Sequence, residues 1–517
     1  MPARRYIFAI FLALCTAASL LPLWVGAHLP AVDAPQHLFL IHVLGSLDDP
    51  SLPYHDHFVA RPGLTYLTFY YTVRALAALV GVEIALKLWL TLVLGAIPLS
   101  LLVLLRALGR SRWLALLACP LLYTDNFYWG LFSFQSSLPF TFFTLGFFVL
   151  ALESDLGTRK ARLALGGCAL SLLLLQLTHA AGMIFPAAAL PLLLLTTRSD
   201  WPRRKRALLA LVPGVAVFFA WLLSGVNRGR QFGKPGEPWK ASGPLFDLDN
   251  FVFHPLRQKV GKLPELLSNG FWDWADRPAL YGLVAVALLA VVLAAVRPQA
   301  STRGPVARLR PALLLLLGLG FYFFLPADIT GYMYQIHPRY AQVAALLAIP
   351  VLPFPSGPLY KVFASAATAL ALYSGVNLAV LFHRFDLETH SFEQVAREIA
   401  PRARIMHLVL DRNSRQATHA VYLHYAALAA LRVDGVPSFS LATDPSFPVG
   451  YKEGAKPPAS PWEWQPQRFT WNDHGSWYDH YLVRGEVSAE RLFGPHLKEL
   501  ELAASAEGWR LFRRKRH

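Results

Sequence analysis

The residues best suited to chemistry lie in a polar stretch that follows the first apolar run of the chain. This stretch opens with Asp33-Ala34-Pro35-Gln36-His37. Proline is favoured at the first position of a helix, so Asp33 is expected at a helix N-terminus, where free backbone N–H groups stabilise a carboxylate. His37 follows four residues later, within reach of the same ligand if the helix forms. The pair is a candidate for a base or a metal ligand, and the simpler interpretation of Asp33 is an N-cap.

A second candidate in the same stretch is a run of three metal-binding residue types. His55, Asp56 and His57 are adjacent in the sequence, and all three side chains can bind zinc. An extended backbone would place both histidines on one face. A metal needs further ligands from elsewhere, and a polar surface loop is the simpler interpretation. A divalent metal ion is the one cofactor that these residues suggest.

Further polar residues stand near the ends of apolar runs. Arg339 beside His337 would suit an anionic group such as a phosphate. Any one of these residues could be an ordinary interfacial side chain. As a group they indicate a binding site, because ionisable residues close to the hydrocarbon are costly and often functional. The candidates for substrate binding are Arg61, Asp125, His179, His337 and Arg339.

The elements that must position these residues are membrane-spanning helices. The chain has 517 residues, of which 55% are hydrophobic and only 15% are charged, and its mean hydropathy is +0.39. Soluble domains carry about 25% charged residues. The net charge of +16 comes mainly from short loops between apolar runs and from the C-terminal region. We therefore interpret the loop charges as a topology signal and expect no nucleic-acid partner.

About twelve apolar segments have the length and composition of membrane helices or parts of them. The three cysteines all lie inside such segments, so neither a disulfide framework nor a cysteine metal site is expected. The segments are 6–26, 65–81, 86–105, 113–127, 131–152, 161–177, 180–197, 207–225, 279–296, 310–326, 340–354 and 360–382.

Basic residues cluster around 106–112, 159–162, 198–206 and 297–310, which places these loops and the N-terminus in the cytoplasm. This topology requires one segment not to cross. The best candidate is 65–81, which is short, carries Arg74 and is rich in tyrosine, as interfacial helices are. We expect an all-α polytopic domain over 1–382 with about eleven transmembrane helices and one interfacial helix. The loops 27–64 and 226–278 are then extracytoplasmic.

The C-terminal region, 383–517, has the composition of a small soluble α/β domain on the extracytoplasmic side. Strands are predicted at 405–410, 478–483 and 509–512, and helices at 417–431 and 488–504. The stretch 452–479 is rich in proline and tryptophan and is predicted to be loop.

The N-terminal third resembles the GT-C superfamily of integral membrane glycosyltransferases, in particular the bacterial mannosyltransferase and lipid A sugar-transferase type. The resemblance rests on a first helix, an outside loop that opens with Asp33, the segment YLTFYY at 66–71, and LVGVEIALK at 79–87. Many members carry two adjacent acidic residues in that loop, whereas Ala34 follows Asp33 here, and His37 is the candidate for the missing polar function.

The resemblance implies transfer of a sugar from a polyprenyl-phosphate carrier to a lipid, glycan or protein acceptor at the bacterial inner membrane. Asp33 would deprotonate or position the acceptor, and Arg339 or Arg61 would bind the carrier phosphate. Alternatives are a transporter or lipid flippase, a polysaccharide polymerase or ligase of another fold, and an inactive scaffold. A transporter usually places ionisable residues near the membrane midplane and often shows paired repeats, and neither pattern is seen in this sequence.

Overall fold

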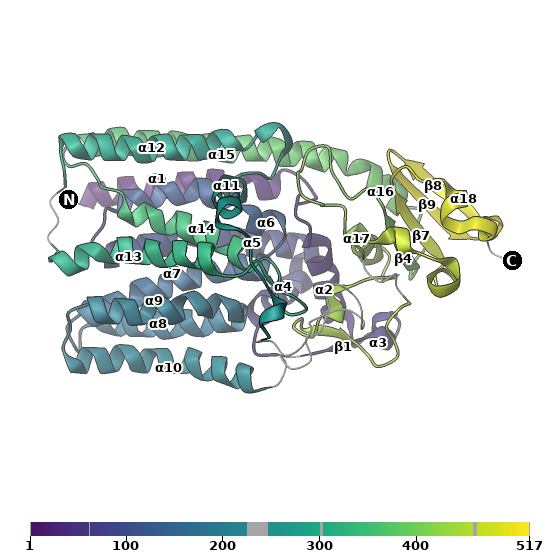
Figure 1. Ribbon diagram of the computed structural model, residues 1–517, viewed down its shortest axis with the longest axis horizontal. Helices are drawn as coiled ribbons and strands as arrows, with labels where there is room; N and C mark the ends of the chain where they lie inside the picture. Colours follow the sequence, from purple (N-terminus) through teal and green to yellow (C-terminus); the bar gives the residue numbers. More distant parts are fainter. Residues whose placement is uncertain (1, 62, 225–246, 300–302, 459–462, 516–517) are drawn as a thin grey trace.

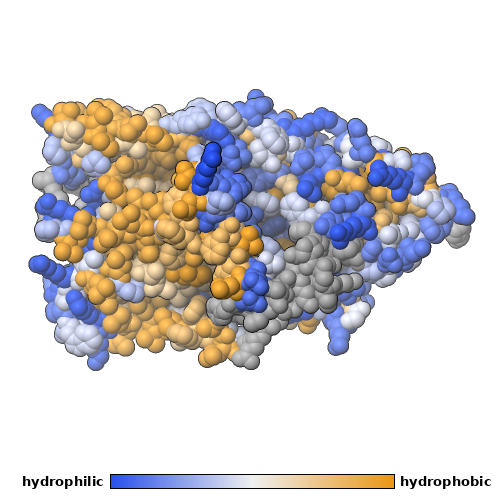
Figure 2. All heavy atoms as spheres, viewed as in Figure 1, coloured by the Kyte–Doolittle hydropathy of each residue, from blue (hydrophilic) through white to orange (hydrophobic). Residues whose placement is uncertain are grey.

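The computed structural model describes residues 2–61, 63–224, 247–299, 303–458 and 463–515. A bundle of helices forms one end of the molecule and a smaller region containing a sheet forms the other, with the N-terminus at the far end of the bundle (Figure 1). Hydrophobic residues cover the visible side of the bundle, whereas hydrophilic residues dominate the region around the sheet (Figure 2). The protein is therefore an integral membrane protein with a large polar portion at one end.

Within the described residues, eight helices are long and apolar enough to cross a membrane. A helix is favoured here because hydrocarbon offers no partners to backbone N–H and C=O groups, and a helix satisfies them internally. The eight are α1 (Pro2–Leu20), α5 (Val82–Ala107), α7 (Phe132–Glu153), α8 (Arg159–Thr178), α10 (Trp201–Leu223), α12 (Arg277–Val296), α13 (Pro305–Phe324) and α15 (Leu359–Glu388).

The other four predicted segments form shorter helices. The predicted interfacial segment is α4, which has 14 residues and lies at the end of the bundle nearer the sheet (Figure 1). Three predicted crossings are also short, which explains why eight rather than eleven helices have spanning length. They are η2 (Arg112–Leu121), a buried 3-10 helix, α9 (Ile184–Thr196) and α14 (Ile336–Ala348). An apolar run of 10–14 residues is at least as well suited to burial against protein as to crossing the membrane.

Glycines let the long helices approach closely. A Cβ atom at Gly375 of α15 would lie 2.3 Å from the carbonyl oxygen of Ala18 in α1. A Cβ atom at Gly146 of α7 would lie 3.0 Å from the backbone nitrogen of Leu104 in α5. Small residues at such crossings are how membrane helices gain contact area.

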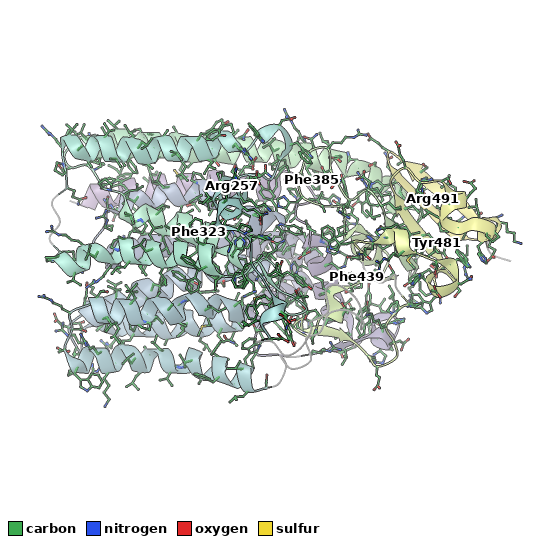
Figure 3. The ribbon with its side chains drawn as sticks, viewed as in Figure 1. Arg257, Phe323, Phe385, Phe439, Tyr481 and Arg491 are labelled. Carbon is green, nitrogen blue, oxygen red and sulfur yellow. The ribbon has the colours of Figure 1, made fainter. Side chains whose placement is uncertain are left out.

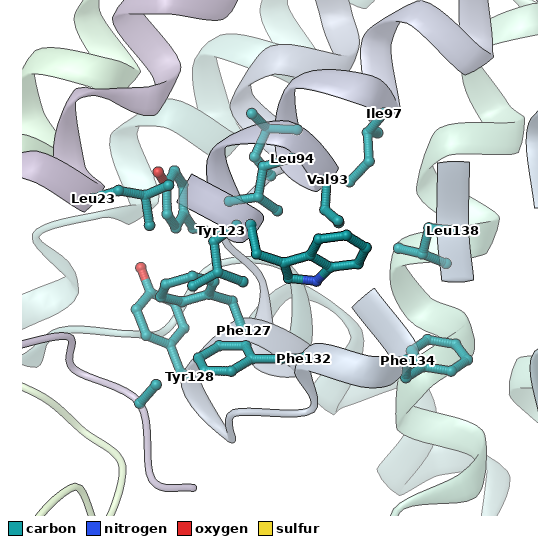
Figure 4. Close-up of a cluster of buried hydrophobic side chains, with 14 of the residues drawn as sticks. Leu23, Val93, Leu94, Ile97, Tyr123, Phe127, Tyr128, Phe132, Phe134 and Leu138 are labelled. Atoms are coloured by element: carbon teal, nitrogen blue, oxygen red, sulfur yellow. The ribbon is translucent and has the colours of Figure 1, made fainter. Parts of the chain in front are cut away.

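The apolar core continues past the long helices into the polar end of the molecule. Figure 4 shows Tyr123, Phe127, Tyr128 and Phe132 packed together in a buried cluster. The short helix α6 (Asp125–Tyr128) supplies two of these rings. These packed rings support the polar loops next to them.

The C-terminal α/β region predicted from the sequence is confirmed. Its five-stranded sheet has the order β5-β4-β7-β9-β8, in which β4 is parallel to both neighbours and β9 is antiparallel to both of its own. The strands are β4 (Arg404–Val409), β5 (Val436–Pro437), β7 (His480–Arg484), β8 (Leu500–Ala506) and β9 (Trp509–Arg514). The helices around them are α16 (His390–Ala396), α17 (Tyr425–Arg432) and α18 (Ala489–Phe493).

Two helix predictions in this region are only partly right. The helix expected over 417–431 is α17, which begins at Tyr425. The helix expected over 488–504 ends at Phe493 in α18, followed by a 3-10 turn and the strand β8. Leu, Glu and Ala favour a helix locally, but pairing with β9 across a tight turn at Gly508, whose φ is +80°, decides the outcome.

The first loop connects the helical bundle to the C-terminal region. It contains α2 (Ala34–Ser46), α3 (Tyr54–His57) and the strand β1 (Phe58–Ala60). β1 pairs antiparallel with β6 (Val449–Tyr451) of the C-terminal region, and α2 packs against α17. A second small ladder joins β2 (Phe251–Val252) to β3 (Asp328–Ile329), beside α11 (Leu256–Leu267).

The end of the bundle opposite the sheet is held by a partly buried ion-pair cluster. Glu153 of α7 pairs with both Arg303 and Arg310, and its oxygen lies 2.7 Å from Nη1 of Arg310, whose side chain is 4% exposed. Arg310 also donates to the carbonyl oxygen of Thr196. Glu153 therefore balances two cations from another part of the chain.

Replacing Glu153 with glutamine should lower the free energy of unfolding by about 3 kcal/mol, because removal of one partner leaves charge buried without compensation. Denaturant or thermal unfolding of the detergent-solubilised protein measures the loss. Asp155→Asn is the matched control, since Asp155 is 80% exposed in its pair with Arg203 and such pairs contribute little. Equal losses in the two variants would contradict this assignment.

Candidate active site

Asp33 occupies the predicted position at the start of α2 but does not cap the helix. Its backbone has φ −87° and ψ −1°, and its side chain accepts no capping hydrogen bond. The carboxylate instead lies 3.1 Å from Nε2 of His424, through Oδ1. The side chain of Asp33 remains 25% exposed, so a reacting group can approach it.

The backbone of Asp33 is fixed by the loop between α6 and α7. The Asp33 N–H donates to the carbonyl oxygen of Trp129, and the Val32 N–H donates to that of Tyr128. The chain then turns at Gly130, whose φ is +79°. A Cβ atom there would lie 2.9 Å from the Asp33 Cβ. Glycine is required at this point both for the backbone conformation and for the close approach.

His424 stands between two carboxylates. Its Nδ1 lies 2.6 Å from Oε2 of Glu463, on the side of the ring opposite Asp33. The side chains of His424 and Glu463 are only 5% and 3% exposed. Both belong to the C-terminal region, and Phe439, which stacks parallel to the His424 ring, lies between the bundle and the sheet in Figure 3. The first loop and the C-terminal region thus build this carboxylate–imidazole–carboxylate array together.

The array holds a charged imidazolium. Burial by itself lowers the pKa of His424, but the charge of Glu463 and the hydrogen bonds to Asp33 and Glu463 outweigh it and raise that pKa to about 10. Burial raises the pKa of Glu463, against the opposing effect of His424. At neutral pH, His424 therefore donates to Asp33 and does not act as a proton acceptor.

A second histidine lies behind the array. Nδ1 of His407 is 3.9 Å from Oε1 of Glu463, and the side chain is 2% exposed. Burial lowers the pKa of His407 to about 3, and the charge of His424 acts in the same direction. His407 is consequently neutral and adds no charge to the array.

His37, predicted as a second catalytic residue, lies buried one turn along α2 from Asp33. Its Nδ1 is 2.6 Å from the hydroxyl oxygen of Tyr70, and its Nε2 is 2.9 Å from the carbonyl oxygen of Gly130. Burial lowers the pKa of His37. A neutral imidazole with both nitrogens engaged holds α2 against α4 and the Gly130 loop, so His37 positions Asp33.

His179 and Arg339 come together in the same region. Nε2 of His179 lies 3.3 Å from Nη1 of Arg339 and 3.4 Å from the hydroxyl oxygen of Tyr66. Arg339 also donates to the carbonyl oxygens of Tyr334 and Gln335.

One aromatic side chain connects this pair to Asp33. Phe447 contacts the rings of Tyr66, Tyr70 and His37, and the His37 N–H donates to the carbonyl oxygen of Asp33. The structure thus joins Asp33, His37, His179 and Arg339 in one network.

Three other predicted substrate-binding residues have separate surroundings. Nε2 of His337 lies 3.3 Å from Nδ1 of His254. Asp125 pairs with His419 at 2.9 Å and forms a second, partly buried imidazole–carboxylate pair. Arg61 donates to the carbonyl oxygen of Tyr451, next to the β1–β6 ladder.

His55, Asp56 and His57 form the helical turn α3, so the extended backbone that would place both histidines on one face is not adopted. His55 contacts the carbonyl oxygen of Leu47, and His57 contacts that of Ala455. Within the described ranges, no group of three or more His, Cys, Asp or Glu residues is placed to hold a metal ion.

Sequence reasoning missed His424 and Glu463. His424 precedes a helix of ordinary apolar composition, and Glu463 lies in the loop rich in proline and tryptophan. Neither position carries a local motif. A buried contact between Asp33 and a residue almost 400 positions away is set by tertiary structure alone.

The charge on His424 predicts a specific pH dependence of stability. A pKa raised from 6.5 to about 10 on folding gives a stabilising contribution that is complete below pH 6.5 and is lost as the pH rises through 10. The difference in unfolding midpoint between wild type and His424→Gln should therefore be largest near pH 6 and narrow towards pH 10. His383→Gln, at an exposed position on α15, is the control. A difference that stays constant over this range would refute the charged state.

Comparison with known proteins gives a structural match over nearly the whole chain. No protein-family model and no curated protein sequence matches. The crystal structure of ArnT from Cupriavidus metallidurans in the apo state has a TM-score of 0.56 and 13% identity, over 99% of this chain and 98% of that one. The same protein bound to undecaprenyl phosphate has a TM-score of 0.55 and 11% identity, over 98% and 97%. The fold expected from the first loop is therefore confirmed, because this chain has the overall fold of ArnT.

Proposed function

We propose that this chain is a membrane glycosyltransferase that moves a sugar from a polyprenyl-phosphate carrier to a lipid, glycan or protein acceptor. The observation that carries the proposal is the array of Asp33, His424 and Glu463, in which a buried histidine holds a partly exposed carboxylate and is itself held by a buried glutamate. Its place at the start of the first loop of an ArnT-like fold supports a role in sugar transfer. The ArnT structure bound to undecaprenyl phosphate supports a polyprenyl carrier.

In the proposed reaction, Asp33 accepts the proton of the acceptor nucleophile. The nucleophile then forms a bond to the anomeric carbon of the sugar, and the bond between that carbon and the carrier phosphate oxygen breaks. The electron pair leaves on the polyprenyl phosphate. Arg339, in the same network as Asp33, is the candidate to stabilise the charge that develops on the phosphate.

His424 would act as a positioning residue. As a protonated donor it fixes one oxygen of Asp33 and leaves the other oxygen for the acceptor. Two carboxylates and one imidazolium carry a net charge of about −1, so the array can accept one proton during the reaction. Glu463 keeps the imidazolium charged, and His37 holds the helix that carries Asp33.

The charge distribution of the loops supports one orientation of the protein in the membrane. The basic loops at the end of the bundle opposite the sheet would face the cytoplasm. Asp33, Arg339 and the C-terminal region would then face the extracytoplasmic side of a bacterial inner membrane. The polyprenyl-linked sugar and the acceptor would meet on that side.

The decisive experiment compares purified wild type with Asp33→Asn on a panel of polyprenyl-phosphate sugars and candidate acceptors. Asp33→Asn should lower the rate of sugar transfer at least about 100-fold, because a positioned general base contributes a factor of about 10² to 10⁴. Asp48→Asn is the matched control, since Asp48 lies in the same loop and is exposed. The measurement is incorporation of radiolabelled sugar into the acceptor.

Two results would count against the proposal. Full transfer by Asp33→Asn would remove Asp33 from the mechanism. No transfer from any donor by folded wild type would favour the transporter or the inactive scaffold, and uptake of the same lipid-linked sugars into proteoliposomes would separate these two.

A further inference from the structure

A small cavity lies where α12 begins, at the end of that helix nearer the sheet (Figure 1), and α15 and the segment before α6 enclose it. Its volume is about 10 Å³, which is about the space that one water molecule or a small ion needs. Hydrophobic side chains form most of its wall. The polar groups come from four residues, Tyr123, Ser268, Asp276 and Ser374.

Asp276 brings a carboxylate to this cavity. It directly precedes α12, but its side chain does not cap the helix. Oδ2 accepts a hydrogen bond from the Gly270 N–H at 2.8 Å, whereas Oδ1 is buried and has no hydrogen-bond partner among the described residues. Asp276 is only 4% exposed. One carboxylate oxygen is therefore removed from water and left without a protein donor.

The negative charge of Asp276 is also uncompensated. No lysine, arginine or histidine in the described part of the chain forms an ion pair with it. The adjacent Arg277 lies over the ring of Trp274 and 3.9 Å from Glu265. Burial raises the pKa of Asp276, and its hydrogen bonds offset this effect only in part. Because a buried carboxylate without a partner is strongly destabilising, this place calls for a positive charge.

Two tyrosine hydroxyls in and beside the cavity lack partners as well. The hydroxyl oxygens of Tyr123 and Tyr128 are buried and have no hydrogen-bond partner among the described residues. Both hydroxyls lie on the same side of the aromatic cluster in Figure 4. A Cβ atom at Gly270 would lie 2.1 Å from Cζ of Tyr128, so this hydroxyl lies next to the residue that binds Asp276. Three buried oxygen atoms without partners thus surround one small space.

The chemistry of these groups suits a monovalent cation. All of the polar side chains that line the cavity offer oxygen atoms, which bind hard cations, and none offers the nitrogen or sulfur that zinc prefers. Calcium sites commonly combine several carboxylates, whereas one carboxylate balances one positive charge. A water molecule would bond to the hydroxyls but would leave the carboxylate charge uncompensated.

We propose that this cavity binds a monovalent cation of about the size of sodium. The ion is held by Oδ1 of Asp276 and by the hydroxyl oxygens of Tyr123, Ser268 and Ser374, with the hydroxyl of Tyr128 beside them. This site is separate from the candidate active site, and the proposal does not depend on the proposed sugar transfer.

A cation at this place joins three parts of the chain. It connects the segment before α6, the start of α12 and the middle of α15. The carbonyl oxygen of Tyr128 accepts a hydrogen bond from the Val32 N–H, directly before Asp33. The ion therefore also supports the loop that fixes the backbone of Asp33.

Binding of radioactive sodium, ²²Na⁺, to the purified full-length chain in detergent tests this proposal. Equilibrium dialysis should show one ²²Na⁺ bound per wild-type chain. Asp276→Asn should weaken this binding at least about tenfold, because it removes the only charged ligand. Asp273→Asn is the matched control, since Asp273 lies in the same loop and is exposed, and it should bind as wild type does.

A second pair of variants tests the hydroxyl ligands and leaves the carboxylate in place. Tyr123→Phe should weaken ²²Na⁺ binding roughly tenfold, because a hydroxyl ligand to the cation is lost. Tyr54→Phe is its control. The hydroxyl of Tyr54 is also buried without a partner among the described residues, but Tyr54 does not line the cavity, so binding should be unchanged.

Thermal unfolding provides an independent readout, because a ligand that binds only the folded state raises the unfolding midpoint. Replacing N-methyl-D-glucamine chloride with sodium chloride at constant ionic strength should raise the midpoint of wild type by about 2 °C. The midpoint of Asp276→Asn should not respond to this exchange. The midpoint of Asp273→Asn should respond as wild type does.

Three results would overturn the proposal. Folded wild type that binds no ²²Na⁺ and has equal midpoints in the two salts would assign the cavity to a water molecule. A wild-type midpoint that responds to pH but not to sodium, with the response lost in Asp276→Asn, would assign the compensating charge to a proton. Equal loss of ²²Na⁺ binding in Asp273→Asn and Asp276→Asn would show diffuse attraction of cations and not a site.

Discussion

A buried positive charge at His424 constrains the whole polar half of this protein. An imidazolium removed from water is strongly destabilising unless anions compensate it. Asp33 and Glu463 provide that compensation from opposite sides of the ring. One anion comes from the first loop and the other from the C-terminal region, so the charge is stabilised only when these two parts are docked.

Several other contacts hold the same docking geometry. The side-chain oxygen of Gln36 accepts from the Leu441 N–H, and His42 contacts Asp434 at 2.7 Å. Farther along the interface, Arg432 of α17 binds both Glu83 and Glu393. These contacts explain how a loop that follows one membrane helix can position a carboxylate to within hydrogen-bonding distance of a separate region.

The match to ArnT shows that a fold can persist when little sequence identity remains. At 11–13% identity the overall fold is retained over nearly the whole chain, because burial of apolar surface can be met by many residue combinations. Function depends on particular side chains in particular places. The proposal of sugar transfer therefore rests on Asp33 and its neighbours, and the fold indicates where to look for them.

By itself, the sequence determined that lipid surrounds much of the chain. It also determined the class of fold and the location of one key residue. Long apolar runs specify helices in lipid because hydrocarbon leaves the backbone no other choice. Short apolar runs specified β4, β7 and β9. Asp33 stood out because a carboxylate, a proline and the end of an apolar run are all local signals.

Tertiary structure decided everything that depends on distant partners. An apolar run cannot reveal whether it faces lipid or protein, so η2 was indistinguishable from a crossing. The helical composition around β8 gave way to pairing with β9. The partnership of Asp33 with His424 and Glu463 left no trace in the sequence, because electrostatic complementarity acts between side chains that only folding brings together.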